Sequence, residues 1–155
     1  GQHETTSMCL EFAEKMDLNG KTVLDVGCGS GILGLCALLL GAKSAELVDI
    51  DSQATEVAKH NAEINGLTSK CSIKTGSLTE KTSGTFDVVF ANLTADILKL
   101  LYDQISAVVH SGTTVVLSGI LDVKASETES LFSGKFDVIE RAAKGEWRAL
   151  LLSAK

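Results

Sequence analysis

Three glycines at alternate positions separate two apolar segments, and this arrangement limits the folds open to the chain. Residues 22–26 (TVLDV) have the β-branched and apolar side chains of a buried parallel strand, and residues 32–40 have those of a core helix. Gly27, Gly29 and Gly31 lie between them. Glycine suits a backbone that turns sharply, often with positive φ, and that lets a ligand approach without an intervening side chain. The segment therefore predicts a strand, a ligand-binding loop and a helix.

Two cofactor patterns match this loop. Gly29, Gly31 and Gly34 fit the dinucleotide fingerprint G-x-G-x-x-G, which is weak on its own. Asp25, Gly27 and Gly29 begin a D-x-G-x-G-x-G pattern, the glycine loop of S-adenosylmethionine-dependent methyltransferases with a Rossmann-like fold. A carboxylate here would repel the pyrophosphate of NAD but suits a ligand that carries an ammonium and a sulfonium group. Asp25 thus favours S-adenosylmethionine, and the simplest alternative is a glycine turn without a ligand.

The composition is that of one ordered globular domain. The chain has 155 residues, of which 45% are hydrophobic, and no proline. This composition excludes a disordered or linker-rich chain. We expect residues 1–155 to form a single domain. Because the chain begins with Gly1 and not with methionine, we also expect that an upstream segment or domain is missing.

Charge and cysteine usage narrow the possible partners. The net charge is −6 and the 14 basic residues are scattered, which argues against direct nucleic-acid binding. An acidic enzyme could suit a basic protein substrate, although such a charge is also ordinary for soluble proteins. The longest apolar run, residues 32–40, is too short to cross a bilayer. The cysteines show no C-x-x-C spacing, which predicts a reduced, cytoplasmic protein without a zinc site.

Strand and helix patterns alternate along the rest of the chain. Strands are predicted at residues 45–50, 71–75, 86–91 and 113–118. Helices are predicted at residues 4–16, 53–65, around 97–108 and 123–132. A turn-rich loop is predicted at residues 81–85. Residues 136–143 and 147–153 predict a closing hairpin. This order predicts an α/β fold, a Rossmann-like, doubly wound and mostly parallel sheet with a C-terminal antiparallel hairpin.

An acidic residue follows the second predicted strand. Asp49 lies 22 residues after Gly27, where a Rossmann-type site places the acid that binds the ribose hydroxyl groups. A helix-capping role is the alternative, but Asp51 is better placed for it.

The three histidines are most simply interpreted as solvated or capping residues: His3, His60 and His110.

Two further polar positions could belong to the site. Asn92 follows the fourth predicted strand, where an amide would face the transferred methyl group. The alternative is that Asn92 caps the next helix, although Thr94 could cap it instead. Thr5, Thr6 or Ser7 would cap the first helix. The N-terminus of that helix could bind the carboxylate of the methionine part of the cofactor, or the hydroxyl groups could serve as caps alone.

Several segments together resemble the bacterial methyltransferases of large-subunit ribosomal protein eleven. The matching segments cover nearly the whole chain: GQHETT at 1–6, VLDVGCGSGIL at 23–33, VDID at 48–51, GSL at 76–78, ANLTADIL at 91–98, LSGIL at 117–121 and GEW at 145–147. The resemblance implies methyl transfer from S-adenosylmethionine to lysine ε-amines and the N-terminal amine of that ribosomal protein. It implies cofactor contacts by Thr6, Gly27, Asp49 and Asn92, and a separate N-terminal domain, absent here, that helps to grip the substrate.

The implied chemistry is an in-line displacement at a sulfonium methyl group. Free lysine has a pKa of about 10.4, so the attacking amine must first lose a proton. No side chain is an obvious strong base, and we expect Asn92 and nearby carbonyl groups to orient the amine. Leu93 and Thr94 follow Asn92, unlike the Asn-Pro-Pro-Tyr of many amine methyltransferases. The alternatives are a methyltransferase of another protein, an RNA base or a small amine, and a non-catalytic or NAD-binding Rossmann domain.

Overall fold

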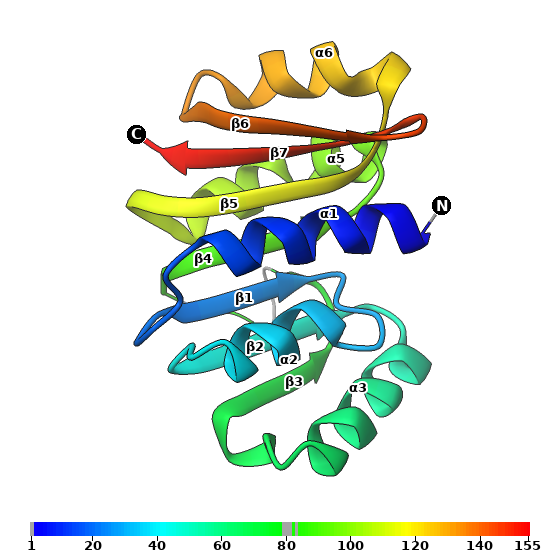
Figure 1. Ribbon diagram of the computed structural model, residues 1–155, viewed down its shortest axis with the longest axis vertical. Coiled ribbons are helices and arrows are strands. Elements are labelled where there is room, and N and C mark those ends of the chain that lie inside the picture. The colour runs from blue at the N-terminus through cyan, green and yellow to red at the C-terminus, as the bar shows by residue number, and fades with distance from the viewer. Residues whose placement is uncertain (1, 79–81, 83) are drawn as a thin grey trace.

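A mixed seven-stranded sheet with helices on both faces forms the domain (Figure 1). This computed structural model describes residues 2–78, 82 and 84–155. The strands are β1 (Thr22–Val26), β2 (Ser44–Asp49), β3 (Cys71–Thr75), β4 (Phe86–Asn92), β5 (Val109–Leu121), β6 (Phe136–Lys144) and β7 (Trp147–Ala154). Their order in the sheet is β3-β2-β1-β4-β5-β7-β6, and among these strands β7 alone runs in the direction opposite to the rest. The predicted doubly wound sheet with a C-terminal hairpin is confirmed.

The helices divide between the two faces of the sheet. In front of it in Figure 1 lie α1 (Gln2–Lys15), α2 (Ile32–Leu39) and α3 (Ser52–Ile64), which a short 3-10 helix, Thr68–Lys70, follows. The opposite face is covered by α5 (Ala95–Ala107) and α6 (Asp122–Phe132). One cluster of buried side chains fills each interface. Within the described part of the chain, no helix has the length and apolar character needed to cross a membrane.

The central strand β1 shows why these residues form a parallel strand. The Val23 side chain packs in the cluster under α1 and α2, whereas Leu24 and Val26 pack in the cluster under α5. A strand that is buried on both faces needs apolar side chains on both, and Val23, Leu24 and Val26 supply them in β1. The strand ends where the chain leaves the sheet at Gly27, whose φ is +67°.

Element boundaries differ from the prediction where long-range contacts decide them. Helix α1 begins at Gln2, so Thr5, Thr6 and Ser7 lie inside the helix and the prediction that they cap it is wrong. Strand β5 extends to both sides of the predicted 113–118 because β4 and β7 pair along it. The register of the β6–β7 pair shifts between Val138 and Glu140. Residues 81 and 83 of the predicted loop lie outside the described residues.

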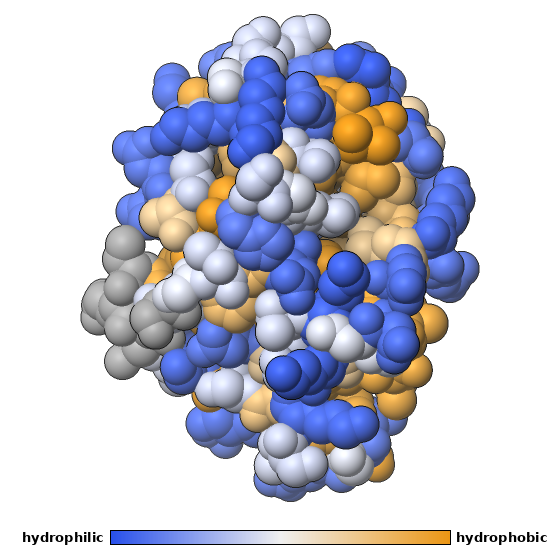
Figure 2. Space-filling model, turned by 90° about the vertical axis from the view of Figure 1, so that its left-hand side faces the viewer, coloured by the Kyte–Doolittle hydropathy of each residue, from blue (hydrophilic) through white to orange (hydrophobic). Residues whose placement is uncertain are grey.

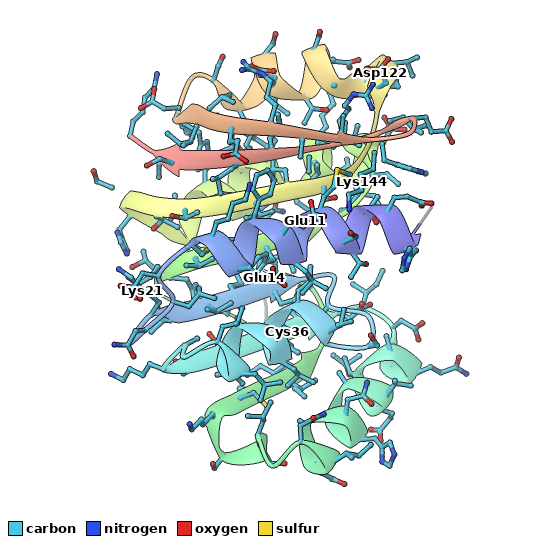
Figure 3. The ribbon with its side chains drawn as sticks, viewed as in Figure 1. Glu11, Glu14, Lys21, Cys36, Asp122 and Lys144 are labelled. Carbon is cyan, nitrogen blue, oxygen red and sulfur yellow. The ribbon has the colours of Figure 1, made fainter. Side chains whose placement is uncertain are left out.

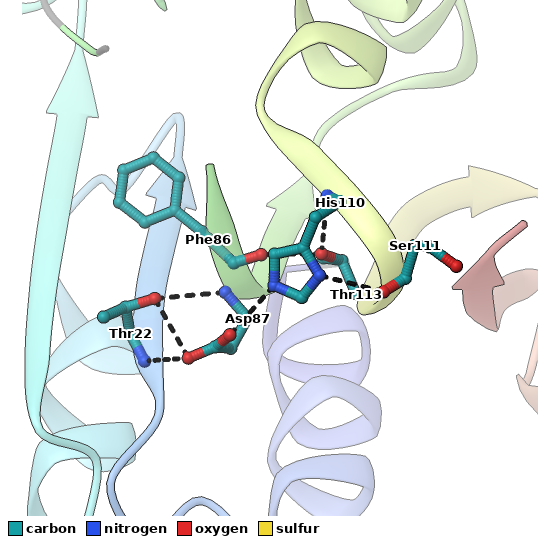
Figure 4. Close-up of polar contacts among 6 residues, drawn as sticks. All are labelled: Thr22, Phe86, Asp87, His110, Ser111 and Thr113. Atoms are coloured by element: carbon teal, nitrogen blue, oxygen red, sulfur yellow. Dashed lines mark hydrogen bonds and ion pairs between the residues drawn. The ribbon is translucent and has the colours of Figure 1, made fainter. Parts of the chain in front are cut away.

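A polar network joins the beginnings of β1, β4 and β5 (Figure 4). One carboxylate oxygen of Asp87 accepts hydrogen bonds from the backbone nitrogen and the hydroxyl of Thr22, at 2.9 and 3.2 Å. The imidazole of His110 contacts the other Asp87 oxygen and the Ser111 carbonyl, each at 2.9 Å. Both oxygen atoms accept hydrogen bonds and so favour the protonated imidazole. The pKa of His110 is therefore raised, mainly by the Ser111 carbonyl and next by Asp87. His110 therefore links strands, which its interpretation as a solvated or capping residue did not predict.

This network lies at the end of the molecule where the parallel strands begin. Figure 2 shows this end, on which hydrophilic residues cover much of the surface and hydrophobic residues form smaller groups. The carboxyl ends of the parallel strands lie at the opposite end, where ligands bind in open α/β sheets. The fold therefore directs attention to the loops that follow β1, β2, β4 and β5.

The close packing of α2 on β2 depends on Gly34. A Cβ atom at this position would lie 2.9 Å from Cγ of Leu47, which is fully buried. We therefore expect Gly34→Ala to lower the free energy of unfolding by about 1–3 kcal/mol through overpacking. Urea denaturation measures this change. Gly134→Ala is the matched control, because a Cβ there meets no atom within 4 Å, and equal losses in both variants would contradict the expectation.

Candidate functional site

A cleft of about 300 Å³ opens at the carboxyl ends of β1 and β4. Its lining comes from five parts of the chain: Thr5 and Thr6 of α1, the segment from Asp25 through the glycine loop to the start of α2, residues 92–94, Gly119 of β5, and Trp147 of β7. Topology explains the convergence, because the carboxyl ends of parallel strands meet at one edge of the sheet.

The predicted site residues gather at this cleft. Five of the six line it: Thr6, Asp25, Gly27, Gly29 and Asn92. The sixth, Asp49, is not among the lining residues but accepts a hydrogen bond from the backbone nitrogen of Gly29 at 2.9 Å. The structure thus places all six in or beside one site.

The glycine loop is held by hydrogen bonds to the end of β2. The backbone nitrogens of Gly27 and Cys28 both donate to the carbonyl of Val48, at 2.8 and 3.0 Å, and that of Gly29 donates to Asp49. A loop that binds pyrophosphate points such groups at the phosphates. These three donors are engaged within the chain, so they hold the loop against the end of β2.

Glycine at position 27 is favoured chiefly by its backbone conformation, and it lies close to Leu93. Its φ of +67° lies in the left-handed region, which is strained for other residues. A Cβ atom there would also lie 2.5 Å from a methyl carbon of Leu93. The loop can therefore approach the segment after β4, and both together shape the cleft.

Asp49 has a fixed orientation beside the loop. Its two carboxylate oxygens accept hydrogen bonds from the backbone nitrogens of Gly29 and Asp51, each at 2.9 Å. A carboxylate oxygen has more than one acceptor site, so both can still accept from hydroxyl groups. The cap of α3 is Asp51, which accepts from the backbone nitrogen of Gln53. Asp49 is thus free of the capping role that the sequence left open.

Asp25 lies under the loop, with 1% of its surface exposed. One oxygen accepts a hydrogen bond from the backbone nitrogen of Gly34 at 3.0 Å. Burial raises the pKa of Asp25 to about 7, and the nearby Asp49 charge acts in the same direction. A cation in the cleft would favour the charged carboxylate, which agrees with the sequence argument for a positively charged ligand.

Asn92 is the last residue of β4 and faces α1. Its amide nitrogen donates to the hydroxyl of Thr6 at 3.5 Å. The cap of α5 is Thr94, whose hydroxyl accepts from the backbone nitrogen of Ile97, so Asn92 does not cap that helix. With the nitrogen bound to Thr6, the amide oxygen is available to a ligand.

Two cleft residues, Gly119 and Trp147, were not predicted as site residues from the sequence. Gly119 has a φ of +82°, and a Cβ there would lie 2.8 Å from the Leu93 carbonyl and 3.1 Å from the Asn92 amide oxygen. Trp147 reaches the cleft from the β6–β7 hairpin. Both lie in segments that carried the family resemblance, LSGIL and GEW, and this was their only signal. Burial raises the pKa of the Cys28 thiol, so this cleft residue stays uncharged.

Among the described residues, no group of three or more histidine, cysteine, aspartate or glutamate side chains could hold a metal ion. All four cysteines are free thiols.

Comparison with proteins of known sequence also indicates a methyltransferase, and the similarity extends over the whole chain. The family model described as "Ribosomal protein L11 methyltransferase (PrmA)" matches residues 1–155. The ribosomal protein L11 methyltransferase of Histophilus somni is 44% identical over 147 residues, which are 95% of this chain and 49% of that protein. The protein of the same name from Neisseria meningitidis is 41% identical over 150 residues, 97% of this chain and 50% of that protein. The chain thus spans about half the length of these curated relatives.

Solved structures agree with these matches. The ribosomal protein L11 methylase of Lactobacillus delbrueckii subsp. bulgaricus superposes with a TM-score of 0.93 and 33% identity, over 100% of this chain and 80% of that one. The magnesium protoporphyrin IX methyltransferase of Synechocystis PCC 6803, solved with bound SAM, superposes with a TM-score of 0.79 and 16% identity. The superposition covers 99% of this chain and 79% of that one and shows that the two share a fold. By its match to the family model and to these relatives, the chain belongs to the ribosomal protein L11 methyltransferase family.

Proposed function

We propose that this domain binds S-adenosylmethionine and catalyses transfer of its methyl group. The observation that carries the proposal is the convergence of Thr6, Asp25, Gly27, Gly29 and Asn92 on one cleft at the carboxyl edge of the sheet. Membership in a methyltransferase family supports it. The buried carboxylate of Asp25 counts against NAD, because it would repel a pyrophosphate.

The acceptors in this proposal are lysine ε-amines and the N-terminal amine of ribosomal protein L11. The names of the relatives support L11 as substrate. A net charge of −6 with scattered basic residues suits a basic protein better than a nucleic acid. The proposal implies a cytoplasmic enzyme, since its substrate is a component of the ribosome.

Each site residue has a role that its surroundings support. Asp49 would accept the ribose hydroxyl groups, because its carboxylate is fixed and retains acceptor capacity. Gly27 and Gly29 would let the cofactor lie against the backbone. Asp25 would balance the positive charge of the methionine part. Thr6 would bind that part from α1 and hold the Asn92 amide.

The reaction needs a correctly placed amine more than a strong base. When bound, S-adenosylmethionine would supply a methyl group on a positively charged sulfur. The acceptor amine would have to be neutral for its lone pair to accept that methyl group as the bond to sulfur broke, and its surplus proton would pass to water. Among the described residues that line the cleft, the titratable groups are Asp25 and Cys28. Asp25 is buried beneath Gly34, and Cys28 is uncharged, so neither is placed as a base. Orientation by Asn92 and proximity would supply most of the rate.

Cofactor binding tests the proposal first. We expect S-adenosylhomocysteine to bind in calorimetry with a micromolar dissociation constant and NAD to show no binding. Asp49→Ala should weaken S-adenosylhomocysteine binding about tenfold or more, because hydroxyl bonds to a charged acceptor are lost. Asp51→Ala is the control, since it removes the α3 cap but leaves the Asp49 side chain. Preferential binding of NAD would refute the assignment.

The raised pKa of Asp25 predicts a pH dependence of this binding. Below pH 7 the buried carboxyl is mostly protonated, and the ammonium group of the ligand must displace that proton, which weakens binding. Above pH 7 the carboxylate is already charged. The affinity for S-adenosylhomocysteine should therefore rise by about tenfold from pH 6 to pH 8. In Asp25→Asn the slope should disappear, and an unchanged slope would exclude Asp25 as its origin.

The role of Asn92 predicts a loss of rate. At saturating S-adenosylmethionine, Asn92→Ala should transfer methyl groups to L11 about 100-fold more slowly, because the amine loses its orientation. Mass spectrometry of L11 measures the rate and identifies the modified amines. Asn65→Ala, at an exposed amide that follows α3, controls for a general effect of removing an amide. A full rate in Asn92→Ala would exclude this role.

A further inference from the structure

Three consecutive residues of α1 are held by three different strands. Each accepts a hydrogen bond from a side chain near the cleft edge of the sheet: the Thr5 carbonyl from Ser118 Oγ of β5 at 3.1 Å, the Thr6 hydroxyl from Asn92 Nδ2 of β4 at 3.5 Å, and the Ser7 hydroxyl from Lys144 Nζ of β6 at 2.6 Å. Because Thr5 and Thr6 line the cleft, this helical turn forms part of its wall.

Lys144 makes the outermost of these contacts. Its ammonium group lies 2.6 Å from Ser7 Oγ and 2.6 Å from a carboxylate oxygen of Glu11. Figure 3 shows Lys144 beside α1, which carries Glu11. Ser7 and Glu11 are four residues apart and therefore lie on one face of the helix. A single side chain thus binds one full turn of α1.

Lys144 also stands at the base of the hairpin turn. Gly145 follows with a φ of +58°, and Trp147, the first residue of β7, lines the cleft. The other side of this turn is bound to the start of α6, because the backbone nitrogen of Asp122 donates to the Glu146 carbonyl at 2.8 Å. The turn that carries Trp147 is therefore held between α6 and α1.

We propose that Lys144 is a positioning residue for the cofactor cleft. By binding Ser7 and Glu11 it fixes the distance between Thr6 on α1 and Trp147 on the hairpin, and so it sets the width of the cleft. The inference rests on the proposed function, since it assumes that this cleft binds the cofactor. An ion pair in which the Glu11 side chain is 52% exposed contributes little to stability, so its effect should appear in the shape of the site.

The chain offers a matched control for this proposal. Lys15 and Glu140 join the same two elements, α1 and β6, through an ion pair of 3.5 Å with side chains 68% and 46% exposed. Lys15 is the last residue of α1, whereas Ser7 lies next to the cleft residues Thr5 and Thr6. Removing this pair also removes one α1–β6 link, but at the end of the helix remote from the cleft residues Thr5 and Thr6.

The test compares Lys144→Met, Lys144→Arg and Lys15→Met with the unchanged chain. Calorimetry gives the dissociation constant of S-adenosylhomocysteine, and fluorescence of the unliganded protein reports Trp147, the single tryptophan. Lys144→Met should raise the dissociation constant about fivefold, which corresponds to a small shift in the wall, and move the emission to longer wavelength. Lys15→Met should change neither property, and Lys144→Arg should restore part of both.

The proposal would be overturned if Lys144→Met had the same affinity and the same emission as the unchanged chain. It would also be overturned if Lys15→Met changed both properties as much as Lys144→Met does. The emission of the unliganded protein tests the position of Trp147 even if S-adenosylhomocysteine does not bind, so this inference and the proposed function can fail separately. If Lys144→Met does not fold, Glu11→Gln replaces it. This variant neutralises the partner of Lys144 and should cause the same changes in smaller degree.

Discussion

The carbonyl of Val48 at the end of β2 accepts two hydrogen bonds from the glycine loop after β1, and the rest of the site depends on this contact. The loop nitrogens of Gly27 and Cys28 make these bonds, and Gly29 adds a third to Asp49. The contact requires the parallel pairing of β1 with β2, in which Val26 lies opposite Val48. The cofactor loop is thus shaped by the sheet itself. The three donors are turned toward β2 and hold the loop in place beside the cleft.

The fold was largely predictable because its signals are local. Residues 22–26 are a strand in the sequence pattern and in the structure, and glycines mark the turns that follow it. The capping role of Thr5, Thr6 and Ser7 was wrong because the partners of these residues lie 86 to 137 positions away in the chain. A helix that is bound along its side by three strands can begin earlier than its hydroxyl groups suggest. Local patterns cannot contain such contacts.

The site was predictable in part for a similar reason. Residues at the ends of β1, β2 and β4 were found because parallel strands place their carboxyl ends together, and because acids and amides there are unusual. Trp147 and Gly119 were not predicted as site residues. Their place in the cleft depends on the antiparallel insertion of β7 between β5 and β6 and on the register shift of the β5–β7 pair. The sequence located the hairpin and its turn, but it did not show that β7 lies between β5 and β6 in the sheet.

The register shift between Val138 and Glu140 has a consequence for how the domain behaves in concentrated solution. Strand β6 is the outermost strand on its side of the sheet, and an open edge is a template for pairing with another chain. The shift leaves Ile139 without a partner in β7. Charged side chains of β6 form ion pairs with helices on both faces of the sheet: Glu140 pairs with Lys15 of α1, and Arg141 pairs with Glu129 of α6. A bulge and fixed charges make a poor template for a further strand. The hairpin that supplies Trp147 to the cleft therefore also protects the sheet from aggregation through this edge.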